Sequence, residues 1–216
     1  MASTESRASG GETGRRTYRS ELRERRTAET RHAVVAAAQR LFVTNGWAAT
    51  GMRDIARAAG VATETVYAHF TSKRGVLQAV ADAAVVGDEA PVPLAERPEF
   101  AAIGRGRRAA RVKTAAQVLS AVQVRTAPIA NLLRQAASAD EAIAEMLELT
   151  RERQRIDVGS ALELIVGRPP TPSERDGVWA VTSPEVYLLL VEGSGWTPGE
   201  YEEWIAETLE RVVPRS

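Results

Sequence analysis

The chain has 216 residues, of which 44% are hydrophobic and 26% charged, and this length and composition suit a globular protein with a buried core. It contains no cysteine, which excludes disulfides and thiolate metal sites. Its best apolar run, "AVADAAVV" at 79–86, is far too short to span a membrane. No charged-then-apolar leader opens the sequence, so a cytoplasmic protein without membrane association is expected.

The formal net charge of zero conceals an asymmetry along the chain. Residues 1–75 carry 13 basic against 7 acidic side chains, whereas residues 76–216 carry 15 against 21. A basic part followed by an acidic part indicates that the first meets a polyanion and the second does not.

The N-terminal segment is polar and rich in arginine. Residues 1–19 have almost no apolar side chains, which predicts a disordered basic tail. The arginines from Arg15 to Arg31 fit two interpretations. They form an arm that enters the minor groove of DNA, or, because glutamates stand among them, a solvated helical extension.

A domain of short helices is predicted over 20–86. Apolar residues from Val34 onward recur at spacings of three and four, which indicates a helix that ends at Asn45-Gly46. Thr50 can cap a second helix that runs to about Ala59. After Gly60 a third helix is expected over 63–69.

The remainder of this domain and everything beyond it also have helical spacing. Ser72 can cap a fourth helix through about Val86, and the proline- and glycine-rich segment 87–106 is expected to be a linker. The larger C-terminal domain, 107–216, is predicted to contain helices over 107–124, 128–137, 140–166, 173–193 with an interruption at 183–184, and 198–213. Strand signals are absent, so the predicted fold class is all-α.

The stretch "GMRDIARAAGVATETVYAHF" at 51–70 carries the strongest functional signal. Two short helices joined by a tight turn at a glycine form a helix-turn-helix, whose second helix enters the major groove of DNA. The second helix has Val66 and Phe70 on its inner side. Its outer side is polar, as hydrogen bonding to base edges and phosphates requires, and is formed by Thr63, Thr65, Tyr67 and His69.

The surrounding segment resembles the DNA-binding domain of the tetracycline-repressor (TetR-type) family of bacterial transcription regulators. The resemblance covers roughly residues 30–80 without a gap. The residues that match the family pattern are Ala38, Leu41-Phe42, Gly46 with Trp47, Thr50, Ile55-Ala56, Ala59-Gly60-Val61, Thr65, Tyr67, His69-Phe70 and Lys73.

This resemblance implies DNA contacts for Thr50, Arg53, Thr63, Thr65, Tyr67, His69 and Lys73. Thr63 and Thr65 would approach base edges, and the other five would contact phosphates. For three of the residues the sequence leaves a plain alternative open. Tyr67 fits the core, His69 fits a packed or solvated position, and Arg53 fits a solvated helix face.

Two residues depart from the family pattern near the second helix of the motif. Ala62 stands where the family usually has a capping Ser or Thr, and Thr63 can substitute if the helix begins one residue later. Glu64 places an acid near the DNA, where it accepts from a cytosine amino group or points away; we favour the second.

The C-terminal domain resembles the family's regulatory domain, most clearly over 178–213. In the family the last two long helices pair with those of a second copy, and a homodimer matches a palindromic operator. The residues predicted for this interface are Val181, Val186, Leu189, Leu190, Trp204, Ile205, Leu209 and Val212. Any one of them also fits the monomer's own core.

The resemblance further implies a small, mostly apolar effector bound among the middle helices. The predicted pocket residues are Leu119, Val122, Arg125, Leu133, Met146, Trp179 and Tyr187, with Arg125 as a polar contact. Apolar residues at helical spacing also fit an ordinary core, so this set does not identify a ligand.

The sequence holds two histidines, no cysteine and no metal-ligand or phosphate-loop spacing, so neither an enzyme nor a cofactor is expected. The chain is therefore predicted to be a sequence-specific DNA-binding transcriptional regulator of a bacterial cytoplasm, a repressor released by its effector. The alternative is an all-helical interaction protein without sequence-specific DNA binding.

Overall fold

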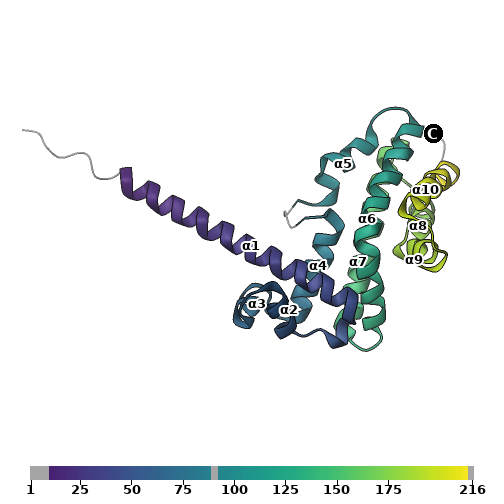
Figure 1. Cartoon of the computed structure of the whole chain (residues 1–216). Coiled ribbons are helices and arrows are strands. Elements are labelled where there is room, and N and C mark those ends of the chain that lie inside the picture. The colour runs from purple at the N-terminus through teal and green to yellow at the C-terminus, as the bar shows by residue number, and fades with distance from the viewer. Residues whose placement is uncertain (1–9, 89–91, 214–216) are drawn as a thin grey trace, which may run out of the picture.

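The computed structural model of the chain describes residues 10–88 and 92–213, with side chains from Leu22 onward. Every regular element in this part is helical, which confirms the predicted all-α class (Figure 1). The first four helices, which we call the head, are α1 (Gly10–Ala49), α2 (Met52–Ala59), α3 (Thr63–Phe70) and α4 (Lys73–Val86). The rest, which we call the body, comprises η1 (Leu94–Glu96), α5 (Pro98–Ala101), η2 (Ala102–Gly104), α6 (Arg108–Ala137), α7 (Glu141–Val166), α8 (Pro172–Val181), α9 (Pro184–Leu188), η3 (Leu189–Gly193) and α10 (Pro198–Val212).

Helix α1 is longer than the sequence predicted at its N-terminal end. Residues 10–19 continue the helix backwards and project from the rest of the molecule (Figure 1). The prediction of a disordered tail is therefore wrong for these residues, because the stretch contains no proline and follows on from the helix-forming segment after it. Residues 1–9 of that predicted tail lie outside the described part of the chain.

Near its other end, α1 is interrupted at the position where the sequence predicted the helix to stop. Gly46 has φ 80° and ψ 173°, a conformation open essentially to glycine alone, and it interrupts the helix just after Asn45. The chain then turns into α2, so that α2 and α3 lie beside the C-terminal half of α1 (Figure 1).

A first apolar core holds the head together and extends into the body. Val34, Phe42, Ile55, Val66 and Val76 meet inside the head, each fully buried. The same cluster continues through the C-terminal half of α6 and the N-terminal half of α7, by way of Ile129, Leu132, Leu133, Ile143, Met146 and Leu147. The head therefore shares its core with the body, although the two are separate in sequence.

A second core lies entirely in the body. It is built around Tyr201 and Ile205 of α10, Leu162 of α7 and Val112 of α6. The predicted linker also contributes, since Phe100 and Ile103 are buried in this core. The segment 87–106 is thus not a plain linker, because two apolar residues three apart in helical turns give part of it a face to bury.

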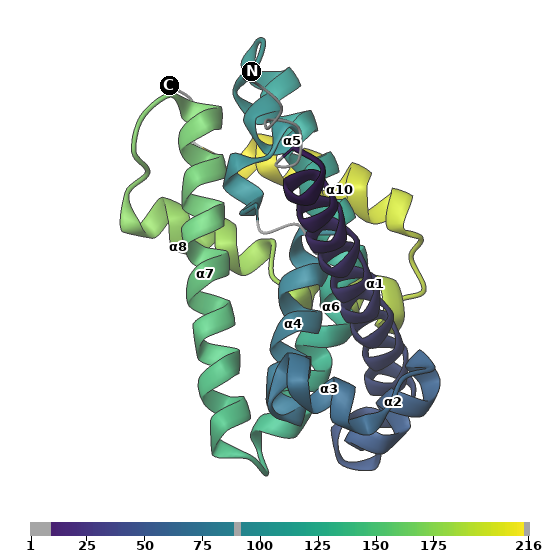
Figure 2. The same cartoon turned by 90° about the vertical axis from the view of Figure 1, so that its left-hand side faces the viewer.

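Helix α6 runs unbroken from Arg108 to Ala137, whereas the sequence predicted a gap before Pro128. Proline in a helix interior removes one hydrogen bond and crowds the preceding turn. Here buried residues on both sides of it, among them Ala127 and Ile129, pack into the two cores. Figure 2 shows α6 behind α1 and α4, in the middle of the molecule.

A tight joint connects α3 to α4. Thr71 has φ 60° and ψ −39°, and the Ser72 N–H donates to the Phe70 carbonyl at 2.5 Å, so the chain makes a γ-turn. Ser72 then caps α4, as predicted, by accepting from the Gly75 N–H at 3.1 Å. A Cβ on Gly75 would overlap the Phe70 carbonyl oxygen. The two helices therefore meet too closely for any other residue at position 75.

Across the described ranges, no helix combines the length and apolar content that crossing a bilayer requires.

The shared core makes a prediction about stability. Replacing Leu133 of α6, which is 1% exposed, by alanine should lower the free energy of unfolding by about 2–5 kcal/mol. It should also reduce hydrogen-exchange protection in α2 to α4, because these helices lose part of their support. Leu162→Ala, equally buried in the second core, is the matched control and should leave the protection of α2 to α4 nearer to its original value. Equal loss in the two variants would contradict a shared core.

Candidate functional site

The residues 51–70 form two helices and not one continuous rod. Gly60 has φ 70° and ψ 29°, the left-handed conformation that glycine adopts at helix C-termini. The Val61 N–H donates to the Ala56 carbonyl at 3.0 Å, which closes the turn. This confirms the predicted helix-turn-helix, with α2 as its first helix and α3 as its second.

Helix α3 has one apolar and one polar side. Val66 and Phe70 are buried in the first core, as predicted. Tyr67 is 50% exposed, which excludes the alternative of a core residue. Thr63, Thr65 and His69 are partly exposed. The surface of α3 thus offers hydroxyl and imidazole groups to a partner, while its apolar side holds it in place.

The start of α3 has no side-chain cap. The helix begins after Ala62, which has an extended backbone and makes no side-chain hydrogen bond. The start therefore does not shift to Thr63, and the expected substitution of a threonine cap does not occur. Glu64 is exposed in the first turn. Backbone N–H groups at this end stay available to an anion.

Thr50 lies inside the head and not on its surface. Its side chain is 1% exposed, and its hydroxyl donates to the carbonyls of Leu41 at 3.2 Å and Gly46 at 2.9 Å. The role of phosphate contact is therefore wrong for this residue. Helix α2 is capped one residue later, where the Gly51 N–H donates to the Asp54 carboxylate at 3.1 Å.

Lys73, predicted to clamp a phosphate, is engaged within the head. Its Nζ lies 4.0 Å from the centre of the Trp47 ring and donates to the Trp47 carbonyl. Partial burial lowers the pKa of this ammonium, and the charge of Asp140 opposes that shift. Lys73 therefore fastens the start of α4 to the turn between α1 and α2. Arg53, by contrast, is exposed on α2.

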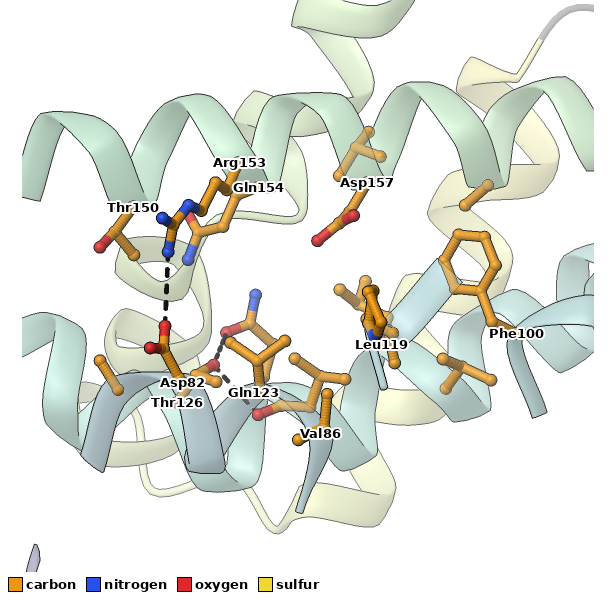
Figure 3. Close-up of a pocket in the computed structure, with 18 of the residues that line it drawn as sticks. Asp82, Val86, Phe100, Leu119, Gln123, Thr126, Thr150, Arg153, Gln154 and Asp157 are labelled. Carbon is orange, nitrogen blue, oxygen red and sulfur yellow. Dashed lines mark hydrogen bonds and ion pairs between the residues drawn. The ribbon is translucent and has the colours of Figure 1, made fainter. Parts of the chain in front are cut away.

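A cavity of about 660 Å³ lies between the head and the body (Figure 3). Its walls come from α4, from residues 92–103, from α6 and α7, and from the region around 179–184. Most of these side chains are apolar. Gln123, Thr126 and Thr182 form a hydrogen-bonded polar group in one wall, in which Gln123 donates to the Thr182 carbonyl at 2.5 Å.

Only part of the predicted pocket lines this cavity. Leu119, Val122 and Trp179 do so, and the indole Nε1 of Trp179 is buried without a hydrogen-bond partner among the described residues. Leu133 and Met146 belong to the first core, and Tyr187 packs edge-on against Tyr201 at 4.8 Å in the second. These three predictions are wrong, because helical spacing gives the inward face of a helix and not the cavity or core that it meets.

Arg125 was predicted to contact the effector, but it holds the end of α4 instead. Its guanidinium donates to the carbonyls of Ala84 at 2.9 Å and Val85 at 3.0 Å. These carbonyls lack partners within the helix, and a cation also complements the negative end of the helix dipole. Burial lowers the pKa of Arg125. Gly87, with φ 85°, ends α4 directly beside this guanidinium.

The cavity is also lined by an acidic residue that is not among the predicted pocket residues. Asp157 of α7 lines it, and burial raises the pKa of this carboxyl group while the charge of Arg153 opposes the rise. In the sequence, Asp157 stands among the many charges of 151–157 and looks like part of a solvated face. The spacing of Asp157 to apolar Ala161 and Leu164 on α7 was the only available signal that it turns inward.

The predicted dimer residues fall into two groups. Ile205 and Leu209 are buried in the second core of their own chain, so their assignment to an interface is wrong. Leu189, which is 68% exposed, and Val212 lie on the surface. The remaining four, partly exposed, are Val181, Val186, Leu190 and Trp204. These six stay predicted interface residues.

Residues 34–80 match the family model described as bacterial regulatory proteins, tetR family. The HTH-type transcriptional regulator TtgR of Pseudomonas putida is 43% identical over 54 residues, which are 25% of this chain and 26% of TtgR. The match thus spans about a quarter of that relative. The similarity in sequence to the tetR family is thus confined to the segment that contains the helix-turn-helix.

Solved structures share the fold over most of this chain. A TetR-family regulator from a Rhodococcus species superposes with a TM-score of 0.66 at 18% identity, covering 86% of this chain and 99% of its own. A TetR-family member from Streptomyces coelicolor gives 0.60 at 19%, covering 86% and 98%. The multidrug binding protein EbrR, solved with imidazole, gives 0.54 at 20%, covering 86% and 96%.

Two threonines in the motif give a matched pair of variants. Thr50→Val should lower the free energy of unfolding by about 1–3 kcal/mol, because two partly buried carbonyls lose their donor. Thr65→Val, on the partly exposed side of α3, should change it by about 0.5 kcal/mol or less. Urea unfolding followed by circular dichroism measures both. Equal stabilities would show that the Thr50 hydroxyl does not support the head.

Proposed function

We propose that the chain is a homodimeric transcriptional repressor of a bacterial cytoplasm that binds a palindromic operator and is released by a small, mostly apolar effector. The observation that carries this proposal is the polar, exposed side of α3 held on a buried apolar side behind a glycine turn. The match of residues 34–80 to the tetR family model supports it.

The chemistry of the head suits double-stranded DNA. Thr63 and Thr65 lie where base edges are approached, and hydroxyls can both donate to and accept from them. Tyr67, His69 and Arg53 can bond phosphate oxygens and so fix the position of α3 in the groove. The Leu22–Glu29 segment of α1 is exposed and carries three arginines, which adds positive charge near the same helices.

The cavity suits an effector that acts on the head. Six of the residues that line it lie on α4, which begins at the joint with α3 and ends under Arg125. A ligand that fills the space between α4 and α7 would press on α4. The first core joins α4 to α2 and α3. A displacement of α4 would therefore move α3 and change the spacing of the two α3 helices in a dimer.

The alternative is a helical interaction protein that binds no specific sequence. An electrophoretic mobility shift with DNA from upstream of its own gene separates the two. A shift that survives excess unrelated DNA at moderate salt supports the regulator, and footprinting would then show a palindromic site. Loss of the shift in the presence of excess unrelated DNA would favour the alternative.

Side chains on α3 should affect DNA binding in two different ways. Tyr67→Phe removes a phosphate contact and should weaken binding to all sequences alike. Thr65→Val removes a base-edge contact and should reduce discrimination at one operator position by roughly tenfold. Competition assays with single-position operator variants measure both effects. If Thr65→Val instead weakened binding to all operator variants equally, the assignment of Thr65 to base reading would be wrong.

The N-terminal arginines give a further prediction. Deleting residues 1–19 should weaken operator binding and make its salt dependence shallower, by a slope of about 0.9 for each phosphate that the shortened protein no longer neutralises. A variant with Arg105→Ala and Arg107→Ala, which removes two exposed charges from the body, is the control. Unchanged binding after the deletion would support the solvated helical extension and exclude the arm.

A further inference from the structure

The charged side chains that line the cavity are few, and most are already paired. They are Asp82, Asp88, Asp157, Arg31 and Arg153. Asp88 accepts two hydrogen bonds from Arg97, both at 2.7 Å. Asp82 pairs with Arg153 at 3.3 Å and accepts from the Gln78 amide at 2.8 Å. Two of the three acids are thus neutralised by partners within the chain.

Asp157 differs from these two acids. Its carboxylate accepts no hydrogen bond and forms no ion pair with any residue of the described ranges. Figure 3 shows it projecting from α7 into the cavity, toward the side that carries Leu119. Removal from water raises its pKa, and the charge of Arg153, itself bonded to Asp82, lowers it less. A carboxylate in such a place is stabilised by an added positive charge.

The walls around Asp157 suit an apolar body. Phe100, Leu119, Val122 and Trp179 all line the cavity. The face of the Phe100 ring also attracts cations, whereas the Trp179 indole already has the Arg155 guanidinium 5.5 Å from its ring centre. An anionic ligand would have to approach three acids and only two bases, both of which have other contacts.

We propose that the cavity binds a lipophilic monocation, whose charged group lies against the Asp157 carboxylate and whose apolar body packs on Phe100, Leu119 and Val122. The inference rests on the proposed function in that it takes this cavity as the effector site, and it adds the chemical class of the effector. Asp157 is then the residue that selects positive charge.

The pairing makes binding depend on pH. A permanent cation requires ionised Asp157, whose pKa in the empty cavity is raised and in the complex is lowered by the ion pair. Affinity should therefore be greatest above the raised pKa and fall as the pH drops through it. The charged groups that also line the cavity are Asp82 on α4, Asp88 just beyond it, Arg153 on α7 and Arg31 on α1. In a variant without Asp157, any pH dependence of binding that these four groups cause would remain.

The test compares two probes of the same shape and opposite charge, tetraphenylphosphonium and tetraphenylborate, by calorimetric titration of the full chain at pH 8. The wild type should bind the cation at least about tenfold more tightly than the anion. Asp157→Asn should weaken cation binding by about tenfold or more, as expected for loss of an interaction with a charged group. Glu163→Gln, on an exposed position of the same helix, is the control and should stay within about twofold of wild type.

Repeating the titration at pH 5 completes the test. Cation affinity should fall in the wild type and change less in Asp157→Asn. The melting temperature of Asp157→Asn should equal or exceed that of the wild type, because an unpaired carboxylate has been removed, and this excludes misfolding as the cause of weakened binding.

Equal or tighter binding of the anion, no binding of the cation at millimolar concentration, or unchanged cation binding in Asp157→Asn would each overturn the inference. Operator binding without ligand tests the proposed function separately. If the operator is bound but the cation is not preferred, only the inference fails. If no operator is bound, the proposed function fails whichever probe the cavity prefers.

Discussion

The apolar sides of the helices of the head are buried against the body, and the arrangement of the DNA-binding motif and of the cavity depends on this burial. Helices α2 to α4 are short, and helices of this length are not stable alone in water. They persist because Val66, Ile55 and Val76 pack into a core that Leu133 and Ile143 complete. The cavity lies along the same boundary and is partly walled by α4. A ligand bound there would therefore lie beside the core that supports the head.

The DNA-binding motif could be predicted from the sequence because its determinants are local. Gly46 and Gly60 adopt backbone conformations that favour glycine; Gly46 interrupts α1 and Gly60 ends α2. Val66 and Phe70 are four residues apart and so share one side of α3. Ser72 likewise indicated a helix start that the structure contains. The predicted interruption at 183–184 falls between α8 and α9, and the helix predicted over 198–213 is α10.

The cavity and its partners could not be predicted in the same way, because they depend on which helices meet. Periodicity shows that Leu133 and Leu119 turn inward, but not that one enters the first core and the other a cavity. Thr50 looked like an exposed cap because its partners, the carbonyls of Leu41 and Gly46, come together only when α1 is interrupted. Pro128 looked like a helix end, yet packing on both sides carries α6 through it. Asp157 stands among other charged residues, and the sequence does not show which of their side chains turn toward the cavity.

The joint between α3 and α4 has a consequence for how a ligand acts. The γ-turn at Thr71 and the contact of Gly75 with the Phe70 carbonyl leave α3 little freedom to tilt relative to α4. The two helices then move as one piece, and the side chains on α3 keep their arrangement while they do. Under the proposed function, an effector would therefore change how strongly the operator is bound without changing which bases are preferred.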